Sequence, residues 1–303
     1  MNSNDASRYK KQTIVFDESG LEASLNYLRN RSDENLKKLL SASGNKLAYD
    51  HNSWSSFSSK ATIEEFWSAQ LSKFTWSPEL ERSIVAVKTY LLRQEKTKWL
   101  NEVLGYLPEG HVFNTVVYLN MGYDDIVFGE NVALNLNSQK FFLDNRESVY
   151  YLIHELAHAG YVRYHPLPDL SNIKTSKELL SIVKYLTHLE GMGVISALKL
   201  RLSEGGLNDN DYKVLLNETE RIRRVNRYFK IINSIERSLD EKVGKNGFQI
   251  PEEMSGRETR LWYITGCHMA QEIEKHHGVE TLRRLVERGS EAFFDAYLEL
   301  TNR

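Results

Sequence analysis

The sequence has little cysteine, little net charge and no long apolar run. A single cysteine, Cys267, among 303 residues excludes an intrachain disulfide and a zinc site built from thiolates, and it suits a reducing compartment. With 39 Lys and Arg against 41 Asp and Glu, the net charge of −2 does not point to nucleic acid or an anionic membrane. No run reaches transmembrane length, and residues 1–13 lack the apolar core of a signal peptide. We therefore expect a cytoplasmic protein without a nucleic-acid or membrane partner.

The composition is that of a globular chain, with 41% hydrophobic and 26% charged residues. A length of 303 residues suits one large domain or two modest ones. We expect residues 1–13 to be a flexible tail and residues 14–107 to form a helical region. Helix-start signals in that region are Ser32, Thr62 with Glu65, and Ser77 before Pro78, the last opening a long helix predicted to run through Leu104.

Residues 111–137 differ in pattern from the helical segment before them. β-Branched and aromatic residues recur there, at 112–119, 126–128 and 132–136. We expect a small antiparallel sheet whose edge strand lies within residues 128–137. An edge strand can bind an extended peptide through backbone hydrogen bonds. Phe128 and Asn135 are therefore candidate substrate-binding residues.

The most specific motif is His154-Glu155-Leu156-Ala157-His158, which reads H-E-x-x-H. Residues four apart lie on one helix face, so His154 and His158 can bind one zinc ion. Glu155 then lies beside the metal and can act as general base toward an attacking water. The motif therefore predicts zinc-dependent hydrolysis.

From residue 144 onward the sequence predicts helices. A capping box of Asp144 with Glu147 opens a helix over 146–164 that carries the motif. A second box, Thr175 with Glu178, opens a helix over 176–204. Further helices are expected within 209–300, in the ranges 209–241, 257–277, 279–288 and 290–300.

A catalytic zinc keeps three protein ligands and one open position, so the motif needs a third ligand. Three residues downstream are candidates: His165, Asp169 and Glu190. We expect Glu190 to be the ligand because Gly191 follows it inside a helix, and such a glycine is tolerated where another backbone or a metal approaches closely. His188 faces another side of the same helix and is expected either to support a ligand from behind or to be structural.

With H-E-x-x-H on one helix and a glutamate on the next, the chain resembles gluzincin-type zinc metallopeptidases. It is also similar to uncharacterised bacterial and archaeal families of zinc-dependent peptidases, through Tyr106-Leu107-Pro108, the motif, Glu190-Gly191 and Tyr263-Ile264-Thr265-Gly266. The resemblance implies an α+β, mainly α fold with a zincin-like catalytic domain over residues 108–303. It also implies a zinc cofactor and a peptide or protein substrate.

The C-terminal segment further resembles M1-type aminopeptidases, in which a tyrosine before x-x-G stabilises the tetrahedral intermediate. The resemblance implies that role for Tyr263, and a phenol is a suitable donor to a developing oxyanion. Gly266, one turn later on the same face, would allow a close approach. Arg260 shares the face of Tyr263 and could hold a substrate carboxylate or carbonyl. His268 is the alternative donor, on a different face.

These residues together predict a zinc metallopeptidase. His154, His158 and Glu190 would bind the metal, Glu155 would be the general base, and Tyr263 would stabilise the oxyanion. Two other interpretations stay open. One is a non-enzymatic helical protein that binds a partner and carries a structural or vestigial metal site. The other is a zinc hydrolase that acts on a non-peptide amide.

Overall fold

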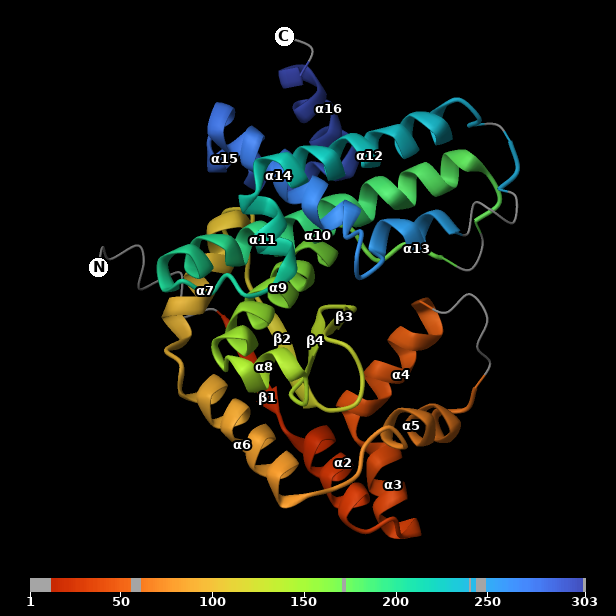
Figure 1. Ribbon diagram of the computed structural model, residues 1–303, viewed down its shortest axis with the longest axis vertical. Coiled ribbons are helices and arrows are strands. Elements are labelled where there is room, and N and C mark those ends of the chain that lie inside the picture. The colour runs from red at the N-terminus through yellow and green to blue at the C-terminus, as the bar shows by residue number, and fades with distance from the viewer. Residues whose placement is uncertain (1–11, 56–60, 171–172, 240, 244–248, 302–303) are drawn as a thin grey trace. The chain divides into compact units, whose positions relative to one another are not determined.

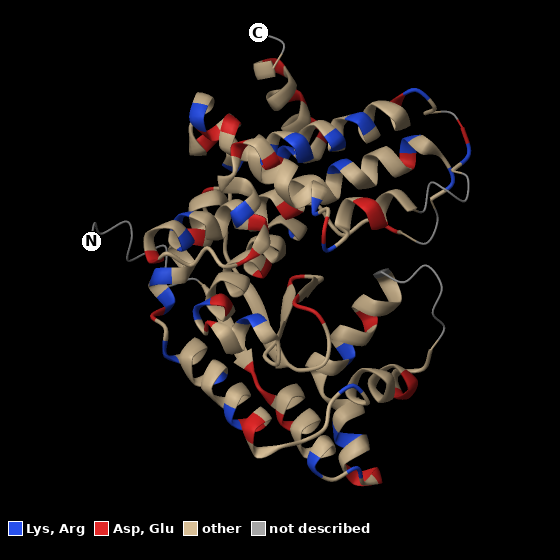
Figure 2. Ribbon diagram, in the orientation of Figure 1, with Lys and Arg blue, Asp and Glu red and all other residues tan. Residues whose placement is uncertain are grey.

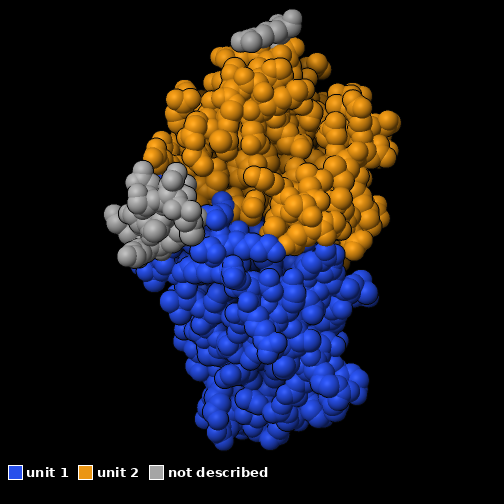
Figure 3. All heavy atoms as spheres, turned by 90° about the vertical axis from the view of Figure 1, so that its left-hand side faces the viewer, with its two compact units in different colours: residues 1–101, 110–163 blue, residues 102–109, 164–303 orange. Residues whose placement is uncertain are grey.

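The computed structural model describes residues 12–55, 61–170, 173–239, 241–243 and 249–301. The chain divides into two compact units, which Figure 3 colours separately. Unit 1 comprises residues 1–101 and 110–163, and unit 2 comprises residues 102–109 and 164–303. The H-E-x-x-H motif therefore belongs to unit 1 and Glu190 to unit 2.

Unit 1 is mainly helical around a small sheet (Figure 1). Its helices are α2 (Ser19–Arg29), α3 (Asp33–Ser41), α4 (Ser43–Ser55), α5 (Ile63–Leu71), α6 (Pro78–Arg93), the start of α7 (Lys96–Tyr106), α8 (Gln139–Leu143) and α9 (Arg146–Val162). Three predicted helix starts are confirmed: Ser32 and Ser77 cap α3 and α6, and Thr62 forms the capping box of α5.

The long helix predicted from Ser77 through Leu104 is wrong, because the chain breaks at Gln94 between α6 and α7. Gln94 has an extended backbone. The buried stripe of α6 ends at Leu91, and the buried stripe of α7 starts at Trp99. Eight residues of continuous helix would rotate Trp99 by about 80° away from that stripe. The break lets both apolar faces meet the core.

The sheet is mixed, so the predicted antiparallel sheet is wrong. Among the described residues it has four strands in the order β1-β2-β4-β3. They are β1 (Thr13–Asp17), β2 (Asn114–Asn120), β4 (Asn131–Asn135) and β3 (Ile126–Phe128). β2 pairs in parallel with both β1 and β4, and only β3 with β4 is antiparallel.

β1 was missed by the sequence analysis, which assigned its residues to a tail and a helical region. Thr13 pairs with Asn114 across a separation of about a hundred residues. A five-residue strand carries little local signal, and its partner is far along the chain. This pairing joins residues 110–163 to the N-terminal helices in one unit, whereas we expected them to belong to a domain over 108–303. Residues 1–11 of the predicted tail lie outside the described residues.

Helices cover both faces of the sheet at β4. Val132, Ala133 and Leu134 are successive residues and all are buried, which requires cover on both sides. α9 contacts β3 and β4, while α4 contacts β2, β3 and β4. α9 itself is buried on nearly every side, as expected of a central helix rather than a surface one.

The start of α9 differs from the predicted capping box. Its N-cap is Asn145, one residue later than expected. The Asp144 carboxylate instead accepts hydrogen bonds from the backbone and guanidinium of Arg146. Asp144 is the C-cap of α8, a short helix that was not predicted from the sequence. Because Asp144 ends α8, the N-cap of α9 falls on the next residue.

Unit 2 is helical (Figure 1). Its helices are α10 (Ser176–Glu204), α11 (Asn210–Leu216), α12 (Glu218–Glu236), α13 (Gln249–Ser255), α14 (Leu261–His277), α15 (Val279–Arg288) and α16 (Ser290–Thr301). The capping box of Thr175 with Glu178 and the span of α10 are confirmed. The single helix predicted over 209–241 is wrong: Asn217 ends α11 and its side chain caps α12.

The two central helices of unit 2, α10 and α14, cross in direct backbone contact. A Cβ atom placed on Gly191 would lie 2.6 Å from the Cα of Gly266, and one placed on Gly266 would lie 2.8 Å from the Cα of Gly191. Real Cβ contacts are not that short. The prediction that these two glycines allow a close approach is confirmed, and the approach is that of helix to helix.

Acidic and basic residues are interspersed over both units in Figure 2 rather than separated by sign. On α12, for example, Arg223 pairs with Glu220 and Arg227 pairs with Glu253 of α13. Of the helices described, none combines the length and the apolarity needed to cross a bilayer.

The crossing predicts the effect of one added methyl group. Gly266→Ala should lower the free energy of unfolding by about 1–3 kcal/mol, the usual cost of overpacking a tight contact. Thermal unfolding followed by circular dichroism measures this. The matched control is Gly105→Ala in α7, where no atom lies within 4 Å of the added Cβ and stability should hold or rise slightly. An unchanged melting temperature for Gly266→Ala would contradict the close crossing.

Candidate metal centre

The two motif histidines lie side by side on buried α9. The ring centroids of His154 and His158 are 4.4 Å apart. Their exposed fractions are only 9% and 4%. A helix that is otherwise apolar and buried therefore carries two adjacent imidazoles on one face. Such an arrangement fits coordination of a single metal ion.

Glu155 lies next to this pair and is also buried. Its Oε2 atom is 3.3 Å from Nδ1 of His158. The side chain is only 6% exposed, and carboxylates are seldom so deeply buried unless they are paired. A carboxylate in this position can accept a proton from a group held at the histidines.

Three further residues of unit 1 act electrostatically near Glu155, and sequence reasoning missed them. Burial lowers the pKa of His51 to about 4, against the opposing charge of Glu155. Burial also raises the pKa of Asp125 to about 6, although Lys140 lowers it and the Glu155 charge adds to the rise. Lys140 Nζ is 3.6 Å from Asp125 Oδ2. No local sequence signal links these positions to the motif, because His51 precedes it by about a hundred residues.

In unit 2, Glu190 lies near Tyr263 because of the α10–α14 crossing. Glu190 directly precedes Gly191, and Tyr263 stands one helical turn before Gly266. Burial and the Glu190 carboxylate, in that order, raise the pKa of Tyr263 above its ordinary value. The phenol therefore stays protonated at neutral pH and can donate a hydrogen bond.

Arg260 stands at the start of α14 and is bound to Asp211. Its Nε is 2.9 Å from both Asp211 oxygens, and one terminal nitrogen is 2.6 Å from Oδ2. Its Cζ lies 3.3 Å from the centroid of the Tyr263 ring. Part of the guanidinium is therefore already engaged within the protein.

The other ligand candidates have different surroundings. His165 lies in the loop after α9, and its Nε2 is 2.8 Å from the carbonyl oxygen of Val286. Asp169 is exposed in the same loop. His188 is fully buried and stacks on Phe293 at 4.1 Å between ring centroids. Burial lowers the pKa of His188 well below its ordinary value, so this ring is neutral.

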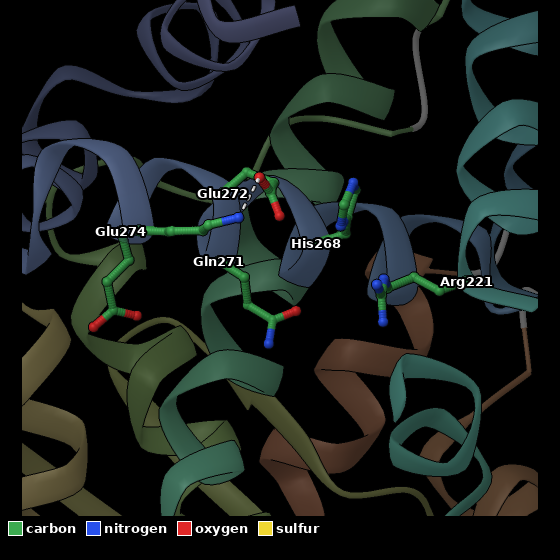
Figure 4. Close-up of a pocket in the computed structure, with 6 residues that line it drawn as sticks. Arg221, His268, Gln271, Glu272 and Glu274 are labelled. Atoms are coloured by element: carbon green, nitrogen blue, oxygen red, sulfur yellow. Dashed lines mark ion pairs between the residues drawn. The ribbon is translucent and has the colours of Figure 1, made fainter. Parts of the chain in front are cut away.

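His268 and Cys267 lie apart from the Glu190–Tyr263 pair. His268 lines a pocket of unit 2 together with Arg221, Gln271 and Glu272 (Figure 4). Cys267 is completely buried, and burial raises the pKa of its thiol. A neutral, inaccessible thiol is not a nucleophile.

The two candidate substrate-binding residues of the sheet have different positions. Phe128 ends β3, the edge strand, and its ring contacts that of His51. Asn135 ends β4, which lies between β2 and β3, so the prediction that this strand is an edge is wrong. The Asn135 side chain accepts a hydrogen bond from the backbone N–H of Gly122.

Candidate metal ligands stand in both units. Unit 1 offers the imidazoles of His154 and His158, and unit 2 offers the carboxylate of Glu190. Two imidazoles and one carboxylate form a known donor set of catalytic zinc, which leaves the fourth position open. The donors present therefore fit zinc.

The neutral state of His188 predicts a loss of stability in acid. Because its pKa is depressed in the fold, the unfolded chain binds the proton more tightly once the pH falls below the ordinary value of 6.5. One such group lowers the free energy of unfolding by about 1.4 kcal/mol per pH unit. Metal-free protein should melt at a lower temperature near pH 5 than near pH 7. His188→Leu should show a smaller difference, and an equal one would contradict this assignment.

Residues 36–303 match the family described as "Putative zinc dependent peptidase (DUF5700)". No curated protein matches the chain, and no solved structure matches it. The matched range runs from α3 to the C-terminus and contains the H-E-x-x-H motif, Glu190 and Tyr263. Because the match covers most of its length, the chain belongs to this family.

Proposed function

We propose that this chain is a zinc metallopeptidase in which His154, His158 and Glu190 bind the metal. The observation that carries the proposal is the pair of buried imidazoles on α9 with the Glu155 carboxylate beside it. The description of the family supports both the metal and the class of reaction. Zinc, when bound at such a site, polarises the scissile carbonyl and lowers the pKa of water.

Three protein ligands favour a catalytic role over a structural one. Structural zinc sites are closed by four protein ligands, most often including cysteine thiolates. The proposed set has no fourth protein ligand, and the single cysteine of the sequence is buried in α14. The donor set therefore leaves room for water or substrate.

Glu155 is the general base in this proposal. Its carboxylate takes a proton from the attacking water and later delivers that proton to the nitrogen of the leaving amine. The 3.3 Å distance between Oε2 and the His158 ring supports this role, since it places the carboxylate beside the ligand set. Its burial keeps bulk water from competing for the proton.

Tyr263 is the donor to the oxyanion in this proposal. Its hydroxyl stays protonated, and its electrostatic coupling to Glu190 is consistent with a position near a ligand of the metal. A preorganised donor aimed at a developing negative charge typically contributes about a hundredfold or more to kcat. The substrate would be a peptide or protein segment, with Phe128 at the edge strand as a candidate contact.

Glu155→Gln tests the general base directly. We expect turnover of a peptide library to fall by at least about a thousandfold, because the amide cannot accept the proton. Zinc content should be unchanged, because Glu155 is not one of the three proposed ligands. Glu130→Gln, which removes an exposed carboxylate paired with Arg163, is the matched control and should keep full activity. Retained turnover in Glu155→Gln would contradict the mechanism.

A further inference from the structure

Arg260 has a strained backbone at the start of α14. Among the described residues it is the one non-glycine residue with a positive φ, which is 47°. Its backbone N–H donates to the carbonyl of Gly256, and its own carbonyl accepts from Ile264. A side chain in this left-handed conformation costs free energy, so surrounding contacts must hold it there.

Asp211 is the contact that holds Arg260. The carboxylate is 7% exposed and receives hydrogen bonds from Nε and Nη2 of the guanidinium. Two hydrogen bonds fix both the plane and the direction of the guanidinium. A lysine in place of Arg260 has no planar group and would not be oriented in this way. Asp211 belongs to α11, so the pair ties α11 to the first turn of α14.

The fixed guanidinium lies over the ring of Tyr263. The distance of 3.3 Å between Cζ and the ring centroid is that of direct stacking, in which the cation is attracted to the ring face. The ring cannot tilt toward that side without displacing the guanidinium. The orientation of the hydroxyl therefore depends on the Asp211–Arg260 pair.

The geometry points to Arg260 as a positioning residue for Tyr263, held in place by Asp211. Arg260 acts by fixing the phenol in the direction of the oxyanion and does not itself contact the substrate. This inference rests on the proposed role of Tyr263. It gives Arg260 a different task from the substrate contact expected from the sequence.

A double-mutant cycle separates positioning from an independent contribution. We expect Tyr263→Phe to lower kcat by about a hundredfold. Arg260→Gln should lower kcat by about tenfold to a hundredfold with KM changed less than about threefold, because a small displacement of a catalytic group has an effect of that size. In the Tyr263→Phe background, Arg260→Gln should cause no further loss. Arg260→Lys should resemble Arg260→Gln, because it lacks the planar fork.

Two controls protect this test from effects on folding. Arg260→Gln leaves the Asp211 carboxylate buried without its cation, so the paired variant Asp211→Asn with Arg260→Gln is measured as well. It should fold, bind zinc and show the same loss in kcat. Arg227→Gln, which removes another arginine–carboxylate pair of unit 2, should leave kcat unchanged.

Three outcomes would overturn the inference. The first is an equal loss from Arg260→Gln with and without the Tyr263 hydroxyl. The second is a raised KM for peptides with a free carboxyl terminus but not for amidated ones, which would make Arg260 a substrate ligand. The third is full activity in Tyr263→Phe, which leaves nothing to position. In that case Glu155→Gln still reports separately on whether the proposed hydrolysis occurs.

Discussion

The backbone contact between Gly191 and Gly266 fixes how closely helices α10 and α14 approach, and with it the positions of Glu190 and Tyr263 in unit 2. Helices α10 and α14 approach there more closely than any side chain would allow. Glu190 and Tyr263 each lie within one turn of the contact, on different helices, and the crossing brings the carboxylate near the phenol. A larger residue at either glycine would separate the two side chains as well as destabilise the helix pair. If the proposed roles of Glu190 and Tyr263 hold, stability and function depend on the same two positions.

Unit 1 contributes a different constraint, which is the burial of polar groups on α9. His154, Glu155 and His158 are each at most 9% exposed, in a helix whose other side chains are mostly apolar. Burying a carboxylate and two imidazoles costs free energy that a surface position would not. Coordination of a cation would compensate for that cost. Polar groups buried in this way are typical of functional sites.

Features encoded within a few residues could be predicted from the sequence, and features that join distant segments could not. The capping boxes at Thr62 and Thr175 depend on residues three apart, and the helices begin where they indicate. The parallel pairing of β1 with β2 has no such local code, because alternation of residues identifies a strand but not its partner. The break at Gln94 likewise follows from the positions of two buried stripes in the core.

The residues of the candidate site likewise fall into those that a local motif predicts and those that only the fold brings together. H-E-x-x-H and Glu190-Gly191 are local motifs, so the ligands of the proposed site could be named from the sequence. The Asp211–Arg260 pair spans 49 positions, and its effect on Tyr263 appears only when α11 and α14 are seen together. His51 and Asp125 near Glu155 are equally invisible in the sequence.

The central claim is that His154, His158 and Glu190 form one zinc site. It is tested most directly by the zinc content of the purified protein beside Glu190→Ala, with Glu291→Ala as a control that removes only an exposed carboxylate paired with Lys184. The account predicts about one zinc ion per chain in the wild type and in the control, and a sharp fall in Glu190→Ala. Equal zinc in all three proteins would remove Glu190 from the site, and no zinc in any of them after metal is supplied would contradict the zinc centre itself.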